Sequence, residues 1–235
     1  MIVTSYYDIY NKPERLIQYS SWFSDLANSG LEIILFTDPS LVKEFQTLPK
    51  TVKVIGLSLD ECELYSLANN YKGDLPSTRN IEKDTKEYLA LINTKIEFIK
   101  KSTEICFDTN LIWLDFGILK VMNNKQQVIS KIKEITLKEH TKIIIPGCWN
   151  FKNFSSDAVC WRFCGGLLIL PRKDVDWFYD KSKEMLISFC TESDKKLVWE
   201  VNLWTAIEII DKEERINWYY GDHNDSMIMN FDNYQ

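Results

Sequence analysis

Acidic side chains follow several of the apolar runs that this sequence predicts as buried strands. Asp115 comes directly after the run 111–114, while Asp38 and Asp222 follow two other runs. Ligands of open α/β sheets bind outside the carboxyl ends of the strands, so these acids would gather where a ligand binds. A carboxylate in such a place is costly unless it is paired or holds a metal ion. Asp115 is therefore a candidate ligand for a divalent cation or a substrate, and the alternative is an Asp that stabilises a turn before Gly117.

Three further side chains could take part in chemistry. Lys95 shares the apolar face of a predicted helix with Tyr88, so it either extends to the rim of the core or meets an anion such as a phosphate. Glu200 stands among aromatic residues, where a carboxylate could act as a base or bind acceptor hydroxyls; a solvent-facing helix Glu is the alternative. His223 follows Asp222, which suits a metal ligand, and packing at the surface is the alternative.

Glycine and cysteine patterns narrow the chemistry further. Gly165 and Gly166 fall inside the predicted strand 163–170 and indicate a bulge or the close approach of a ligand. The sequence contains no Gly-x-Gly-x-x-Gly and no Walker loop, which disfavours dinucleotide-binding and P-loop proteins. The 6 cysteines form no Cys-x-x-Cys pair and are accompanied by only 2 histidines, so the sequence predicts no zinc site. His140 stands at a charged helix end and is expected to be exposed.

Alternating strands and helices would position these residues. Apolar runs predict strands, and spacings of three or four between apolar residues predict helices. A single α/β domain over residues 1–235 is expected, with three layers and helices on both faces of a central, mostly parallel sheet. The predicted strands are 2–7, 31–36, 52–57, 111–115, 142–146, 163–170 and 216–220. The predicted helices begin at Pro13, Ser40, Val128, Asp174 and Lys196, and another, capped by Asp84, runs to about Lys101.

Composition excludes several classes of protein. The chain has 235 residues and a net charge of −6, with a sequence pI near 5.1, so it does not bind nucleic acid through bulk positive charge. No apolar run approaches the roughly 18 residues of a membrane-spanning helix. The first residues lack the basic and apolar pattern of a signal peptide, which predicts a cytoplasmic protein.

Two motifs are more specific than the rest, Trp113-x-Asp115-Phe116-Gly117 and Gly221-Asp222-His223. With other segments they resemble, in order along nearly the whole chain, nucleotide-sugar transferases of the GT-A fold, and in detail the bacterial HtrL/YibB family. The other matching segments are 2–9, 36–38, 88–95, 162–166 and 200–204.

The resemblance implies a GT-A-like (Rossmann-like) glycosyltransferase that moves a sugar from a nucleotide-diphosphate donor to a glycan or another hydroxyl acceptor, with Mn²⁺ or Mg²⁺. The donor side would comprise Thr4, Ser5, Tyr6, Asp38, Asn93, Lys95 and Asp115. The acceptor side would comprise Arg162, Gly165, Gly166 and Asn202. Catalysis would involve Asp115 and Glu200, and the metal ligands would be Asp115 and His223. We expect Thr4, Tyr6, Lys95, Asp115 and His223 to converge on one cleft.

One position departs from the family pattern. GT-A transferases carry a second Asp two residues after the first, and here Gly117 takes that place. This leaves two alternatives open. The chain could be a non-catalytic protein of the same fold that binds a nucleotide or glycan, or a nucleotidyltransferase on the same architecture.

Overall fold

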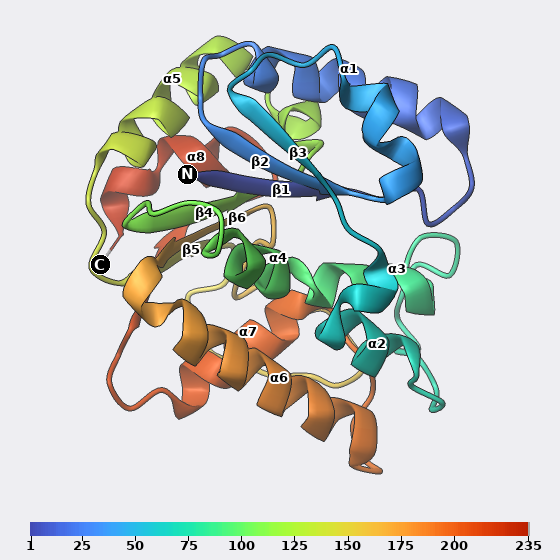
Figure 1. Cartoon of the computed structure of the whole chain (residues 1–235). Helices are drawn as coiled ribbons and strands as arrows, with labels where there is room; N and C mark the ends of the chain where they lie inside the picture. Colours follow the sequence, from blue (N-terminus) through green and yellow to red (C-terminus); the bar gives the residue numbers. More distant parts are fainter. Residues whose placement is uncertain (235) are drawn as a thin grey trace.

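One seven-stranded sheet runs through the computed structural model, which describes residues 1–234, in the order β3-β2-β1-β4-β6-β5-β7 (Figure 1). Strand β6 is antiparallel to both of its neighbours, and the remaining pairs are parallel. The predicted mixed, mostly parallel sheet is therefore confirmed. The strands are β1 (Ile2–Tyr6), β2 (Ile33–Thr37), β3 (Val52–Gly56), β4 (Asn110–Leu114), β5 (Ile143–Gly147), β6 (Leu167–Pro171) and β7 (Ile216–Tyr220).

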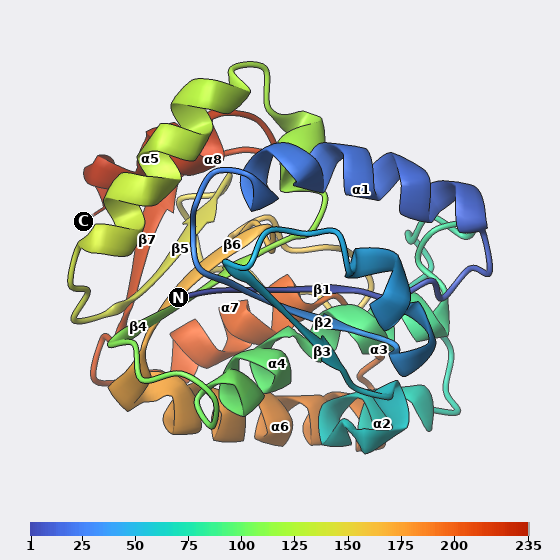
Figure 2. The same cartoon turned by 45° about the horizontal axis from the view of Figure 1, so that its top comes forward.

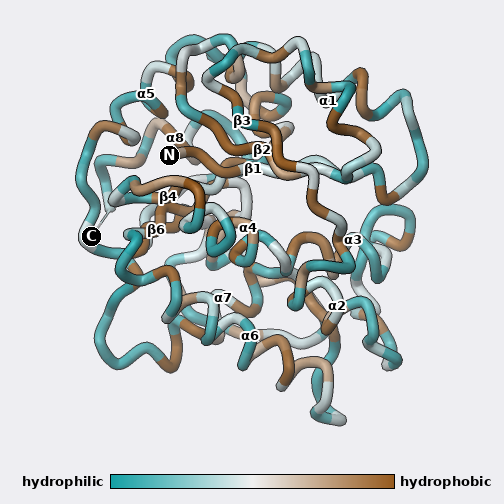
Figure 3. The backbone as a smooth tube through the Cα atoms, viewed as in Figure 1, coloured by the Kyte–Doolittle hydropathy of each residue, from teal (hydrophilic) through white to brown (hydrophobic). Residues whose placement is uncertain are grey.

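Continuous apolar runs explain why the central strands form. Every residue of β2, β4, β5 and β6 is buried, as expected for strands covered by helices on both faces. The hydropathy colouring shows β2, β4 and β6 among the hydrophobic stretches at the centre of the molecule (Figure 3). Side chains alternate between the two faces, so β4 sends Leu111 and Trp113 into one core and Ile112 and Leu114 into the other.

Helices cover both faces and complete three layers. One face packs against α1 (Pro13–Ala27), α5 (Lys125–Leu137) and α8 (Ser226–Met229), and we call it the α1 side. The other, the α4 side, packs against α2 (Glu63–Asn69), α3 (Lys86–Asn93), α4 (Lys95–Ser102), α6 (Val175–Thr191) and α7 (Glu200–Ile210). Figure 2 shows α1 and α5 above the sheet and α4 and α6 below it. None of the helices within residues 1–234 is long and apolar enough to cross a membrane.

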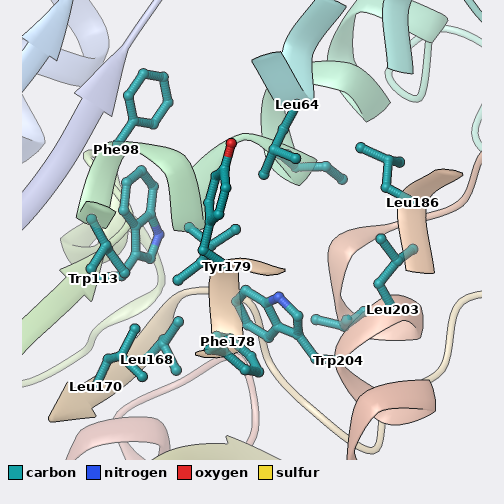
Figure 4. Close-up of a cluster of buried hydrophobic side chains, with 14 of the residues drawn as sticks. Leu64, Phe98, Trp113, Leu168, Leu170, Phe178, Tyr179, Leu186, Leu203 and Trp204 are labelled. Carbon is teal, nitrogen blue, oxygen red and sulfur yellow. The ribbon is translucent and has the colours of Figure 1, made fainter. Parts of the chain in front are cut away.

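The core on the α4 side combines aromatic rings with aliphatic side chains (Figure 4). Phe98 stacks on Trp113 with ring centroids 6.2 Å apart, and Phe178 lies 6.1 Å from Trp204. Each such ring, once buried, contributes roughly 1.5–3 kcal/mol relative to an exposed one. This packing joins α4 to β4 and α6 to α7 on one face of the sheet.

The helix predicted to run from Asp84 to Lys101 is in fact two helices. Its cap is Thr85, whose hydroxyl accepts from the Tyr88 backbone N–H at 3.2 Å, and not Asp84. The helix breaks at Thr94, where the hydroxyl donates to the Ala90 carbonyl at 2.8 Å, a contact that often bends helices. Lys95 therefore opens α4.

Other boundaries also differ from the prediction. Helix α7 begins at Glu200 and not at Lys196, which puts this acid in the first turn. Strand β6 begins at Leu167, so the Gly165-Gly166 pair precedes the strand. The expectation of an exposed His140 is wrong. Its ring is buried, with Nε2 at 2.9 Å from the Ile135 carbonyl oxygen, and burial lowers its pKa.

Candidate functional site

The point where the strand order reverses lies between β1 and β4. Strands β2 and β3 extend the sheet on one side of β1, whereas β4 and its neighbours extend it on the other. Open α/β sheets bind ligands in the crevice at this switch point, outside the carboxyl ends of the strands. Asp115 follows β4 directly there, and its side chain is 43% exposed. Because β6 is antiparallel, its beginning reaches the same edge, and the Asp115 backbone N–H donates to the Gly166 carbonyl at 3.0 Å.

Lys95 joins two acids behind this edge, and we call Lys95, Asp115 and Glu200 the Lys95 cluster. Its ammonium nitrogen lies 2.9 Å from Asp115 Oδ1, 2.7 Å from Glu200 Oε1 and 2.8 Å from the Gly165 carbonyl oxygen. An ammonium has three hydrogens, and all three are used here. Burial opposes the charge on Lys95, but the two carboxylates outweigh it and raise the pKa of the ammonium. Lys95 thus neither extends to the rim nor keeps a hydrogen free for a phosphate.

Backbone and indole groups fix the cluster. The Trp113 indole N–H donates to Asp115 Oδ1 at 2.8 Å, so this oxygen accepts from two donors. A Cβ on Gly165 would lie only 2.0 Å from Glu200 Oε1, so glycine is required for the carboxylate to approach. The close approach predicted from the glycine pair is therefore made at Gly165 by this side chain. With one cation and two carboxylates, the cluster carries a net charge of −1.

Tyr88 belongs to the same neighbourhood, although no role was predicted for it. Burial raises the pKa of its hydroxyl well above the usual value, and the charges of Glu200 and Asp115 raise it further. In the sequence, Tyr88 stands seven residues before Lys95. This spacing of two helical turns is the signal that could have placed both residues on one helix face.

The predicted donor residues of β1 divide between the two faces of the sheet. Thr4 and Tyr6 belong to the α1 side, and Ser5 faces the α4 side, because side chains alternate along a strand. Thr4 is fully buried, and its hydroxyl has no hydrogen-bond partner in the described residues 1–234. Burial, and then the charge of Asp8, raise the pKa of Tyr6 to about 12. The expected convergence of Thr4 and Tyr6 with Lys95 is therefore wrong, whereas half-buried Ser5 faces the α4 side.

The side chains of two other predicted donor residues, Asp38 and Asn93, form hydrogen bonds with backbone groups. The Asp38 carboxylate accepts hydrogen bonds from the backbone N–H of Ser40 at 2.9 Å and from the Ser40 hydroxyl at 2.6 Å. Asp38 thereby caps the start of a 3₁₀ helix. The Asn93 amide donates to the Leu89 and Val198 carbonyls, both at 2.8 Å. The second contact ties α3 to the segment just before Glu200, so Asn93 positions that acid from outside the cluster.

The predicted acceptor residues Arg162 and Asn202 fix the loop between β5 and β6. Arg162 is buried and makes a bidentate pair with Glu208 of α7 at 2.8 and 2.6 Å, and it also donates to the Trp149 carbonyl at 3.1 Å. The Asn202 carbonyl oxygen accepts from the Cys160 N–H at 2.9 Å, and its amide donates to the Ser155 and Ala158 carbonyls at 2.8 Å. Both side chains therefore anchor this loop to α7.

A second cluster lies near the ends of β5 and β7, and we call Cys148, Cys164, Asp222 and His223 the thiol cluster. The two sulfurs are 3.7 Å apart, and one ligand atom from each of the two thiols and His223 lie within 4.8 Å of one another. His223 Nδ1 lies 3.2 Å from Asp222 Oδ1 and 3.9 Å from Cys164 Sγ. The sequence predicts no zinc site, and it did not indicate that these two cysteines lie beside His223.

The thiol cluster belongs to the α1 side of the sheet, unlike the Lys95 cluster. Cys164 is part of that core and Cys148 packs against it. Within residues 1–234 no hydrogen bond or ion pair joins Asp115 to His223. Burial, and to a smaller extent the hydrogen bond to Asp222, raise the pKa of the Cys148 thiol to about 11. Burial also raises the pKa of the Cys164 thiol. The thiols are therefore protonated at neutral pH.

A cavity of about 610 Å³ opens elsewhere, between the ends of α2 and α6. Tyr71, Asp74, Lys195 and Lys196 are among its lining residues, and none of the residues predicted for the site lines it. We place the candidate site at the switch point, since the acids, the indole and the buried ammonium converge there.

Comparisons with known proteins identify no family. No known family matches the sequence, and no curated protein matches it. Among solved structures, the bifunctional IspDF from Campylobacter jejuni resembles it with a TM-score of 0.39 and 11% identity. The similarity covers 99% of this chain and 52% of IspDF, so the chain spans about half the length of that protein. A likeness this low carries no argument about function.

Proposed function

We propose that this chain is a glycosyltransferase that binds a nucleotide-diphosphate sugar at the β1–β4 switch point and transfers the sugar to a hydroxyl acceptor. The observation that carries the proposal is the place of Asp115, a half-exposed carboxylate directly after β4 and held by Trp113 and Lys95. Sheets of this kind bind ligands at this point. The motif resemblance to GT-A transferases of the HtrL/YibB kind supports the same assignment.

Charge is the reason to include a divalent cation, Mn²⁺ or Mg²⁺, in this proposal. The Lys95 cluster is negative overall, so it would repel a donor diphosphate that approached alone. A bound cation would neutralise the diphosphate and so stabilise the leaving group. Asp115 offers the hard, half-exposed oxygen ligand that such ions prefer. The predicted second ligand, His223, contacts groups on the α1 side, so we do not assign it to this ion.

The chain's own residues would hold the reacting groups. In the transfer, the acceptor oxygen bonds to the anomeric carbon, the bond from that carbon to the diphosphate oxygen breaks, and the hydroxyl proton leaves to a base. Asp115 is at the edge and can touch the donor. Glu200 is buried against Lys95, so we assign it the role of orienting Asp115 through the shared ammonium. Gly165 and Gly166 lie beside Asp115, on the side we propose for the acceptor.

A non-catalytic binding protein is the second candidate, and Gly117 is the observation that favours it. A Cβ at this position would lie 2.9 Å from the Tyr19 ring, so the packing leaves little room for the second acid of the family pattern. Such a protein would bind the nucleotide or glycan but leave the sugar–phosphate bond intact.

Donor hydrolysis and transfer assays separate the two candidates. The protein is incubated with UDP-, GDP- and CMP-sugars, with and without Mn²⁺, and release of the nucleotide is followed. The proposal predicts release with one donor class, strongly reduced in Asp115→Asn and unchanged in Asp176→Asn, an exposed acid that follows the end of antiparallel β6 at the opposite edge of the sheet. Binding of a nucleotide without turnover of any sugar would favour the binding protein.

A further inference from the structure

The thiol cluster combines ligand types that differ from those at the switch point. It offers two sulfurs, one imidazole nitrogen and one carboxylate oxygen, all from residues near the carboxyl ends of β5 and β7 or the loop before β6. Thiolates and imidazole select Zn²⁺ among the common divalent ions, while Mg²⁺ and Mn²⁺ prefer oxygen. We propose that Cys148, Cys164, Asp222 and His223 form a tetrahedral zinc site. The inference does not rest on the transferase proposal.

The distances between the ligand atoms support a single tetrahedral ion. With Zn–S bonds of about 2.3 Å, tetrahedral angles place two sulfurs about 3.8 Å apart. The Cys148 and Cys164 sulfurs are 3.7 Å apart. The same construction places sulfur and a carboxylate oxygen about 3.5 Å apart, and nitrogen and oxygen about 3.3 Å apart. Cys148 Sγ lies 3.3 Å from Asp222 Oδ1, which in turn lies 3.2 Å from His223 Nδ1.

The pairs of sulfur with His223 depart further from this geometry, since the two sulfurs and the imidazole nitrogen all lie within 4.8 Å of one another. Sulfur and nitrogen ligands of one zinc ion are expected about 3.5 Å apart, and Cys164 Sγ lies 3.9 Å from His223 Nδ1. A shift of a few tenths of an ångström in a half-exposed ring would close this difference. A disulfide needs its sulfurs at about 2.05 Å, so the present separation fits two ligands of one ion better than a bonded pair.

The ligands of the proposed site are partly buried and partly exposed, so the site could hold an ion and also be reached from solvent. Cys164 is fully buried, while the Asp222 and His223 side chains are 48% and 43% exposed, which leaves an entry from solvent. The Trp161 ring packs edge-on against His223 with centroids 4.7 Å apart, so it helps to fix the imidazole. Binding would replace the thiol protons with the ion, and proton release is therefore part of the reaction.

Zinc binding would also decide what His223 can do. A neutral imidazole has one lone pair, and Nδ1 is the nitrogen that faces Cys164 and Asp222. When this nitrogen binds zinc, His223 no longer serves a second ion at the switch point. A cation there would then depend on Asp115, water and the donor's oxygens.

The test measures metal without any nucleotide. The protein is reduced, stripped with a chelator and equilibrated with Zn²⁺, and the metal content is determined after gel filtration. We expect one zinc per chain, a rise in Tm of roughly 5 °C or more at a hundredfold excess over Kd, and thiolate-to-metal absorption when Co²⁺ replaces zinc. Cys148→Ser and His223→Ala should each weaken zinc binding at least tenfold.

Matched variants keep the test decisive. Cys190→Ser removes a half-buried thiol far along α6 and should keep the full zinc content. Cys148 is only partly buried, so its serine variant avoids the packing cost at buried Cys164; its metal-free Tm verifies the fold. Three results would each overturn the proposal. They are reduced wild-type protein that retains no zinc, equal zinc content in Cys148→Ser and wild type, and a Co²⁺ form without thiolate absorption.

Discussion

The Lys95 cluster and the thiol cluster lie at the same edge of one sheet but differ in their charges. In the first, a buried ammonium is surrounded by three oxygen acceptors, so its positive charge is already balanced before any ligand arrives and one negative charge remains. In the second, neutral thiols and half-exposed polar groups stand near one another with no cation among the described residues between them. The first cluster is therefore built to hold Asp115 in place, whereas the second has ligands available for an ion.

The same comparison explains which parts of the site the sequence could reveal. Asp115 was found because it follows an apolar run, and Lys95 because of its helical phase. Neither signal could show that Lys95 Nζ contacts Asp115, Glu200 and the Gly165 carbonyl. These contacts depend on where α7 begins, because Glu200 is its first residue.

In the thiol cluster only Asp222 and His223 had a local signal, and the two cysteines had none. Cys148 and Cys164 are separated by a loop of fifteen residues, and His223 follows almost sixty residues later. They meet because β6 runs antiparallel between β4 and β5, which brings the start of β6 to the carboxyl edge. The apolar runs predicted the strands correctly, but a run of this kind does not encode its own direction.

The largest effect is expected from removing the charge that holds the first cluster together. Lys95→Met leaves two carboxylates beside each other without their partner, and breaking a buried pair in this way costs about 3–5 kcal/mol. Urea unfolding measures the loss. Lys101→Met is the matched control, because this partly exposed lysine pairs with Glu97 at 3.8 Å and should cost less than about 1 kcal/mol. A loss equal to the control would mean that the cluster contributes nothing to stability.

A methyl group at Gly165 tests the same cluster by steric means. The new Cβ would stand 2.0 Å from Glu200 Oε1, so Gly165→Ala should push this carboxylate from Lys95 and cost about 1–3 kcal/mol of unfolding free energy. Gly166→Ala is the control, since its Cβ would meet only the ends of the Ile118 and Met227 side chains, at 2.9 and 3.0 Å. The account fails here if the Gly166 variant loses more stability than the Gly165 variant.

The smallest effect on stability is expected from the titration of His140. Burial lowers the pKa of His140, so the unfolded chain takes up a proton more readily than the folded one. Its contribution to stability is therefore present above the ordinary pKa near 6.5 and is lost as pH falls through the lower folded-state pKa. Urea midpoints between pH 7.5 and 5 should fall more steeply in the wild type than in His140→Asn. Parallel curves would show that the ring is not the titrating group.

The most direct test of the central claim is calorimetric titration of a nucleoside diphosphate into the protein with and without Mn²⁺. If Asp115 holds a cation that the donor's oxygens share, Mn²⁺ should tighten UDP or GDP binding by fivefold or more, and nucleotide should tighten Mn²⁺ by the same factor. Asp115→Asn keeps the shape of the side chain and should abolish this coupling, while Asp176→Asn should retain it. Equal nucleotide affinities with and without Mn²⁺ in the wild type would contradict a cation site at Asp115.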